Sequence, residues 1–115
     1  MGYMRHHAIC VTSWDGDRLA EAHQQARNLC GELVSPIIPG NINGEHSFFV
    51  APDGSKEGWS TSDEGDLNRA ALIDFMRQER YAGGYLDWVE VQYGDDERET
   101  RIIASSDDDQ RAVAR

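Results

Sequence analysis

Polar and apolar residues alternate along residues 5–14, which is the pattern of a strand with one buried face. His7, Ile9 and Val11 share one side of this segment, and the residues between them point to the other side. Because Ile9 and Val11 are the larger aliphatic side chains, we expect their side to face the core.

The pattern then changes to a helical period. Asp15, Gly16 and Asp17 can cap the start of a helix, and Gly31 is suited to ending it. Between them, apolar residues recur every three or four positions at Leu19, Ala22, Ala26, Leu29 and Cys30. We predict one amphipathic helix here.

Residues 33–38 and 45–51 predict a second and a third strand. The prolines at positions 36 and 39 cannot donate ladder hydrogen bonds, so the second strand should lie at a sheet edge. Asn43-Gly44 predicts a tight turn before the third strand, whose apolar run 48–50 indicates a central position.

A second helix is predicted to begin at the capping-box pattern Thr61-Ser62-Asp63-Glu64 and to end at Ala82-Gly83-Gly84. Its spacing predicts a buried stripe of Leu67, Ala71, Leu72, Phe75 and Met76.

Two strands complete the pattern, over residues 86–93 and 99–104, joined by a turn at 94–98. In the first of them we expect Val89 and Val91 to point inward. The alternating residues Trp88, Glu90 and Gln92 would then point outward.

This order of elements predicts an α+β fold: a ferredoxin-like βαββαβ split with an extra C-terminal β-hairpin strand and with the helices on one face of an antiparallel sheet. The expected strand order is 4-1-3-2, with the fifth strand beside the fourth. An irregular α+β roll in which residues 36–44 form a loop is the alternative. Residues 1–105 are expected to form a single domain, and residues 106–115 a polar, frayed tail.

The charge balance restricts the classes of partner. Among 115 residues, 21 acidic and 11 basic side chains give a formal net charge of −10. Such a charge disfavours general nucleic-acid binding and favours basic partners. The sequence contains neither an apolar signal segment nor a run of membrane-spanning length, so we expect no membrane contact and a cytoplasmic location. Cys10 and Cys30 lack metal or redox spacing and are expected to be buried thiols.

The predicted topology brings several scarce basic residues to one end of the sheet, because the start of the first strand meets the ends of its antiparallel neighbours. A ligand-binding patch is predicted there, with donors for an anion and aromatic rings for stacking. It consists of Arg5, His6, His7, Ser55, Lys56, Trp59, Tyr93 and Arg101. The alternative is that these groups only pair with the nearby acids Asp53, Glu57 and Asp95.

Catalytic and metal chemistry have weaker support. Neighbouring residues of a strand point to opposite faces, so His6 and His7 cannot easily share one metal ion. Ser13, Ser47 and Ser55 have no assigned general base. We therefore predict no metal site, no cofactor and no catalytic residue. A small hydrolase or nuclease that uses His6 or His7 is a third possibility after the two binding functions below.

The outer face of the predicted sheet is too apolar to remain in water. We expect it to carry Ala8, Cys10, one of Phe48 and Phe49, and Trp88. A homo-oligomer, either a dimer or a larger assembly, is the expected cover, and a ligand or the C-terminal tail is the alternative.

Four stretches carry a resemblance that covers most of the chain: residues 5–9, 11–14, 47–59 and 88–95. They resemble small uncharacterised proteins of phages and prophages, some of which antagonise host immunity. This implies a non-enzymatic anti-defence protein in the host bacterial cytoplasm that sequesters a small nucleotide-like ligand, such as an immune second messenger. An acidic protein–protein inhibitor of a host defence protein, of the anti-CRISPR or DNA-mimic type, is the alternative.

Overall fold

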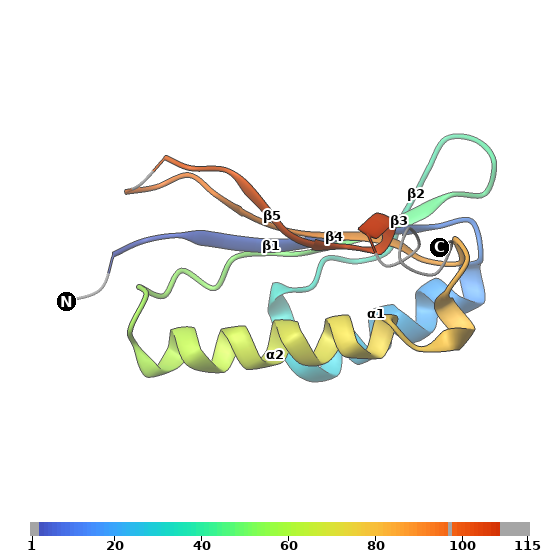
Figure 1. The fold of residues 1–115 in the computed structure, drawn as a ribbon. Coiled ribbons are helices and arrows are strands. Elements are labelled where there is room, and N and C mark those ends of the chain that lie inside the picture. The colour runs from blue at the N-terminus through green and yellow to red at the C-terminus, as the bar shows by residue number, and fades with distance from the viewer. Residues whose placement is uncertain (1–2, 97, 109–115) are drawn as a thin grey trace.

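Antiparallel strands form one open sheet, and two long helices cover one of its faces (Figure 1). The computed structural model describes residues 3–96 and 98–108. Within them the order is β1 (His6–Ser13), α1 (Gly16–Cys30), η1 (Gly31–Leu33), β2 (Ile38–Pro39), β3 (His46–Val50), α2 (Ser60–Met76), η2 (Glu79–Tyr81), β4 (Asp87–Tyr93) and β5 (Arg101–Ser105). The fold is therefore α+β, as predicted.

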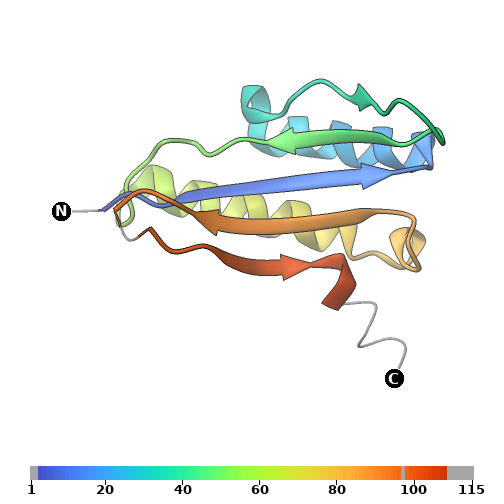
Figure 2. The same cartoon turned by 90° about the horizontal axis from the view of Figure 1, so that it is seen from above.

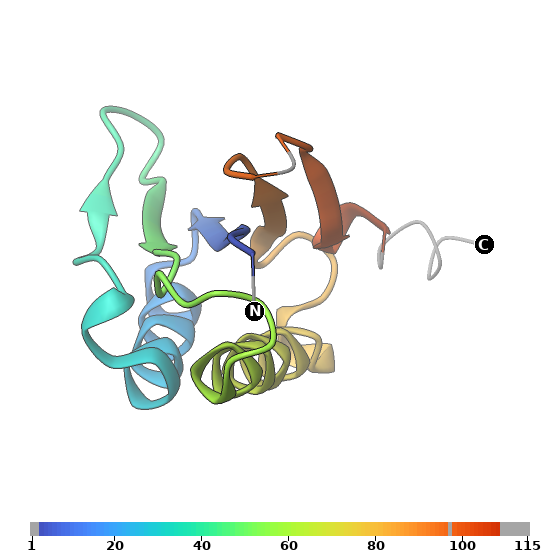
Figure 3. The same cartoon turned by 90° about the vertical axis from the view of Figure 1, so that its left-hand side faces the viewer.

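The five strands lie in the order β2-β3-β1-β4-β5, and every neighbouring pair is antiparallel (Figure 2). Each strand has the neighbours that the sequence predicted. β1 is the middle strand: Ile9 is opposite Val50 of β3 on one side and Glu90 of β4 on the other. An end-on view places both helices beneath the sheet and leaves the opposite face open (Figure 3).

The core lies between the sheet and the helices. Ile9 and Val11 of β1 are fully buried, which confirms the predicted orientation of this strand. They belong to one cluster with Leu19, Ala22, Ala26, Phe48, Val50, Leu72, Ile73 and Met76. Burial of these apolar side chains is the main stabilising contribution to the fold.

The first helix begins and ends where the sequence predicted. Asp15 is its N-cap, and the Asp15 carboxylate accepts a hydrogen bond from the Arg18 backbone N–H at 3.0 Å. Gly31 follows the helix with φ 59°, a left-handed conformation that favours glycine.

The orientation predicted for β4 is wrong. Trp88 is opposite Val11 and Glu90 is opposite Ile9, and residues opposite each other share a face. Trp88, Glu90 and Gln92 therefore point toward the helices. Val89 and Val91 point outward. Val89 and Val91 on one side and Trp88 on the other make both faces of β4 apolar, so the alternation alone does not show which face is buried. The large indole of Trp88 takes the buried side, and Glu90 finds an ionic partner there.

The second helix differs from the prediction at both ends. It begins at Ser60 with Trp59 as N-cap, without a side-chain capping bond, so the expected capping box at 61–64 is not used. It ends at Met76, and η2 follows it. Leu67 is 71% exposed and Ala71 is exposed, contrary to the predicted stripe, whereas Arg69, which the stripe did not include, is buried.

The second strand is also shorter than predicted. It comprises only Ile38 and Pro39 at the sheet edge, because η1 and the nearby prolines prevent a longer ladder. Asn43 and Gly44 form the predicted turn, with φ 62° and 66°.

The packed part of the chain continues past residue 105. Residues 106–108 are helical, and the Ser106 hydroxyl accepts a hydrogen bond from the Trp88 backbone N–H at 2.9 Å. The rest of the predicted tail, residues 109–115, lies outside the described residues.

Cys10 is exposed, contrary to the prediction, because it lies on the open face of the sheet, and Cys30 is half-buried.

Candidate functional site

The start of β1 meets the loop before α2, as the topology predicted. Met4 forms a backbone bridge with Lys56, and the Glu57 N–H donates to the Tyr3 carbonyl at 2.8 Å. On the other side of β1, His6 is opposite Tyr93 of β4. The structure therefore brings the predicted residues of β1, the loop and β4 to one end of the sheet.

Acidic neighbours accompany the basic groups of this predicted patch. His7 Nε2 lies 2.9 Å from Glu57 Oε1, and His6 Nε2 lies 3.3 Å from Asp95 Oδ2. Arg101, on the edge strand β5, pairs with Glu99. These contacts reduce the positive charge available to an anion, which is the arrangement that the alternative interpretation of the patch predicted.

The two histidines lie on opposite faces of the sheet. His7 shares the helix side with Ile9, whereas His6 lies on the open side, where its ring centre is 5.4 Å from that of Tyr93. His23 and His46 each contact a backbone carbonyl elsewhere. Within residues 3–96 and 98–108, no cluster of three or more His, Cys, Asp or Glu side chains could hold a metal ion.

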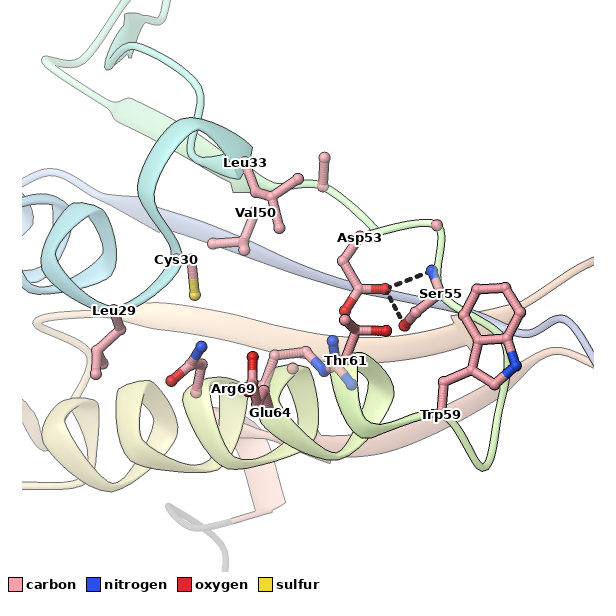
Figure 4. A pocket seen from close by; sticks show the side chains of 14 residues that line it. Leu29, Cys30, Leu33, Val50, Asp53, Ser55, Trp59, Thr61, Glu64 and Arg69 are labelled. Atoms are coloured by element: carbon pink, nitrogen blue, oxygen red, sulfur yellow. Dashed lines mark hydrogen bonds between the residues drawn. The ribbon is translucent and has the colours of Figure 1, made fainter. Parts of the chain in front are cut away.

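A cleft of about 430 Å³ opens beside this patch, on the helix side of the sheet. Its walls are the first half of α2, the end of α1 with η1, and the loop that follows β3 (Figure 4). The apolar part of the lining includes Leu29, Leu33 and Val50, and the polar part includes Asp53, Ser55, Thr61, Glu64, Asn68 and Arg69. Trp59 stands at the loop end of the cleft and is 50% exposed.

Asp53 is a fixed carboxylate in this cleft. Its Oδ1 accepts hydrogen bonds from the Ser55 backbone N–H at 2.9 Å and from the Ser55 hydroxyl at 2.7 Å. Burial alone would raise the pKa of Asp53, but the bonds from Ser55 and the positive charges of Arg69 and His7 outweigh it, and the pKa is lowered. Asp53 is therefore ionised at neutral pH.

Gly65 lets this carboxylate approach the helix. A Cβ atom at Gly65 would overlap Asp53 Oδ2, so any larger residue at this position would displace the Asp53 side chain. The same hypothetical atom would lie 3.2 Å from Arg69 Nη1, so Gly65 opens the space in which Asp53 and Arg69 come near each other.

Arg69 forms the charged wall behind Asp53. Its side chain is 8% exposed and pairs with Asp66 one helical turn earlier, and its Nε lies 3.4 Å from Glu90 Oε2 on β4. Burial raises the pKa of Glu90, and the charge of Arg69 opposes this only in part. Two carboxylates thus already share the guanidinium of Arg69.

Cys30 also lines the cleft. Burial raises the pKa of the Cys30 thiol against the opposing charge of Arg69. A neutral thiol is a poor nucleophile, so the cleft presents ionic and hydrogen-bonding groups above an apolar floor rather than an activated sulfur.

The sequence prediction included Ser55 and Trp59 of this cleft but missed Asp53 as a binding group, as well as Glu64 and Arg69. Asp53 was considered only as a partner for nearby bases. Arg69 was missed because a charged residue in a buried helix position breaks the apolar stripe. Glycine within the helix at position 65 was the available signal, since it indicates a close approach by another group.

The chain matches no known protein family, no curated protein and no solved structure. Within the part of the chain that the structure describes, no helix is long and apolar enough to cross a membrane.

Proposed function

We propose that this protein is a non-enzymatic binding protein whose cleft receives a basic side chain of a partner protein. The observation that supports this is that two carboxylates, Asp53 and Glu64, line the same cleft as Trp59 and the apolar side chains of Leu29 and Leu33. Carboxylates would bind the charged head of an arginine or lysine, and the aromatic and apolar groups would pack against its stem.

The charge of the whole molecule supports the same ligand class. A net charge of −10 attracts a basic partner over several ångströms and increases its association rate. On the basis of the resemblance to phage proteins, we propose that the partner is a host defence protein and that the protein acts as an acidic inhibitor in the bacterial cytoplasm.

We also propose that the sheet belongs to the ferredoxin-like class. The strand order and the placement of both helices on one face support this assignment. The cleft would then lie between the two crossover helices and the sheet end.

A titration with a labelled arginine–glycine repeat peptide tests the proposal, with a glutamate–glycine repeat as the charge-reversed probe. Asp53→Asn and Glu64→Gln should each weaken binding of the arginine peptide by roughly tenfold, which is about 1.4 kcal/mol. Asp74→Asn removes the same charge from an exposed position of α2 and should leave binding unchanged. Equal binding by all variants, or no binding at low salt, would contradict the proposal.

Sequestration of a nucleotide-like ligand is a second candidate, because Lys56 Nζ lies 5.8 Å from the centre of the Trp59 ring at the start of α2. A base could stack on Trp59 while phosphate contacts Lys56 and the first N–H groups of the helix. A thermal-shift screen with cyclic dinucleotides and ADP-ribose tests this, since ligand at a hundred times its Kd stabilises by about 2.7 kcal/mol. Lys56→Gln would abolish that shift, whereas Asp53→Asn would leave it intact or increase it.

A further inference from the structure

The open face of the sheet is a continuous apolar surface across its strands. Residues that are directly opposite in the ladder share a face, and Cys10 is opposite both Phe49 and Val89, Ala8 is opposite Val91, and Val91 is opposite Ile102. We define the outer face by Ala8, Cys10, Phe49, Val89, Val91 and Ile102. Ile102 is 66% exposed and Cys10 is exposed, Phe49, Val89 and Val91 are half-buried, and Ala8 is buried by its neighbours. Part of this apolar surface therefore remains in contact with solvent.

Charge is absent from the middle of this surface. Among the described residues that pair in the sheet, the register places no Asp, Glu, Lys, Arg or His side chain on the open side except His6 at one end and Asp87 at the other. A protein with 21 acidic residues thus places none of its described acids at the centre of this face. Depletion of charge at the centre distinguishes protein interfaces from other surface.

The size of the outer face suits a second sheet. The five strands comprise 27 residues. At about 3.3 Å per residue and about 4.8 Å between strands, they give on the order of 430 Å² per copy. Two copies would bury on the order of 900 Å², near the roughly 1,000 Å² of the smallest specific interfaces. A small ligand would leave most of this area exposed.

The distribution of acids favours a second copy of the same chain. Acidic residues lie on the helices, including Asp17 and Glu21 on α1 and Asp63, Glu64 and Asp66 on α2, all on the side of the sheet opposite the outer face. Pairing through the outer faces separates these acids by two sheet layers, which minimises repulsion between two chains of charge −10. Figure 1 also shows that the β2–β3 connection, which includes the 73% exposed Ile42, bends away from the helices toward the side that a partner would occupy.

We propose that the protein forms a two-fold symmetric homodimer in which the outer faces pack against each other. The sheets would pack about 10 Å apart, as in a β-sandwich. Cys10 lies at the middle of the central strand β1, so a two-fold axis through the centre of the face brings the two Cys10 thiols close together. The cleft lies on the opposite side of each sheet and remains open, so this inference is independent of its ligand.

Light scattering during size exclusion tests the assembly. The wild type should have twice the chain mass of 12.9 kDa. Ile102→Lys introduces a charge into the outer face at an exposed position, so the fold should tolerate it, while the dimer should weaken by roughly tenfold or more. Leu67→Lys makes the same change at a 71% exposed position of α2 and should remain dimeric. A monomeric wild type, or a dimer equally stable in both variants, would overturn the proposal.

A short bis-maleimide cross-linker then locates the interface. Cross-linked dimer should form in the wild type and in Cys30→Ser, and it should disappear in Cys10→Ser. Cys30 lies in the cleft on the helix side and serves as the control thiol. A dimer that cross-links only through Cys30 would place the contact on the helices and refute the outer face. Circular dichroism of each variant shows whether it remains folded.

Discussion

Asp53 and Arg69 can approach each other at the cleft because position 65 of α2 carries no side chain. Gly65 lies inside α2, where alanine would normally improve helix stability by up to about 1 kcal/mol. The Asp53 carboxylate occupies the space that the alanine methyl group would require. Geometry at this one position therefore opposes helix propensity, and the difference between the two effects can be measured.

We expect Gly65→Ala to destabilise the protein by about 1–2 kcal/mol in urea unfolding, because the methyl group must displace Asp53 from the helix. Gly16→Ala is the control, since a Cβ there has no atom within 4 Å. Asp53→Ala should rescue much of the loss in the double variant. If Gly65→Ala stabilises the protein as much as Gly16→Ala does, the close approach of Asp53 is not a constraint.

Tyr81 is a second residue whose surroundings change its chemistry. Its hydroxyl donates to Glu21 Oε1 at 2.8 Å. Burial and the Glu21 carboxylate raise the pKa of Tyr81 to about 12. The folded state holds the phenol proton more strongly than the unfolded state does.

An ultraviolet titration should show one of the four tyrosines ionising near pH 12, in place of its ordinary value near 10. Because the folded pKa is raised, the stabilisation from this group is complete below pH 10 and is lost as the pH rises from about 10 to 12. Tyr81→Phe should remove the late step and flatten the loss of stability in this window. Four indistinguishable phenols would contradict the Glu21 contact.

At the scale of elements, the two helix starts show how local signals succeed and fail. At α1 the capping residue Asp15 sits directly before the apolar repeat, and its hydrogen bond to Arg18 sets the boundary. At α2 the residues of the capping box lie within the first turn, because the carbonyl of Trp59 already accepts from Ser62 and Asp63. The predicted capping box therefore has no capping function in α2.

A pair of alanine variants separates these two cases. Asp15→Ala should lower the urea midpoint, because it removes a hydrogen-bonded cap, whereas Thr61→Ala should change it little. The bond to the Arg18 backbone N–H lowers the pKa of Asp15, so the contribution of Asp15 is present above its unfolded pKa and is lost as the pH falls through its folded pKa. An equal effect of the two substitutions would mean that Thr61 caps α2 in solution.

The strands show the limit of periodicity more clearly. β1 could be oriented from its sequence because only one of its sides carries large aliphatic residues. β4 could not, because it carries valine on one side and tryptophan on the other. Which side is buried depends on the ion pair between Glu90 and Arg69, a residue of α2 that is distant in the sequence. An ion pair between residues far apart in the sequence leaves no local pattern from which it could be predicted.

For the whole molecule, connectivity was more predictable than the site. Strand order followed from the sequence of elements, and it placed His6, His7 and Lys56 at one sheet end. The cleft was not predicted, since it depends on how closely α2 approaches the loop after β3, and that spacing is determined at Gly65. The charge at this end could not be predicted either, because the contacts of His6 with Asp95 and of His7 with Glu57 depend on side-chain positions.

The central position of β1 also has consequences for the order of events during folding. Residue 9 contacts residue 50 on one side and residue 90 on the other, so most of β1's pairing spans long stretches of chain. Such non-local contacts slow folding relative to helical proteins of similar size. During synthesis, the β4 side of β1 must stay unpaired until residue 93 has been made, and an apolar strand exposed for that time is prone to pairing with other chains. Conditions that slow translation after residue 50 would lengthen this vulnerable period.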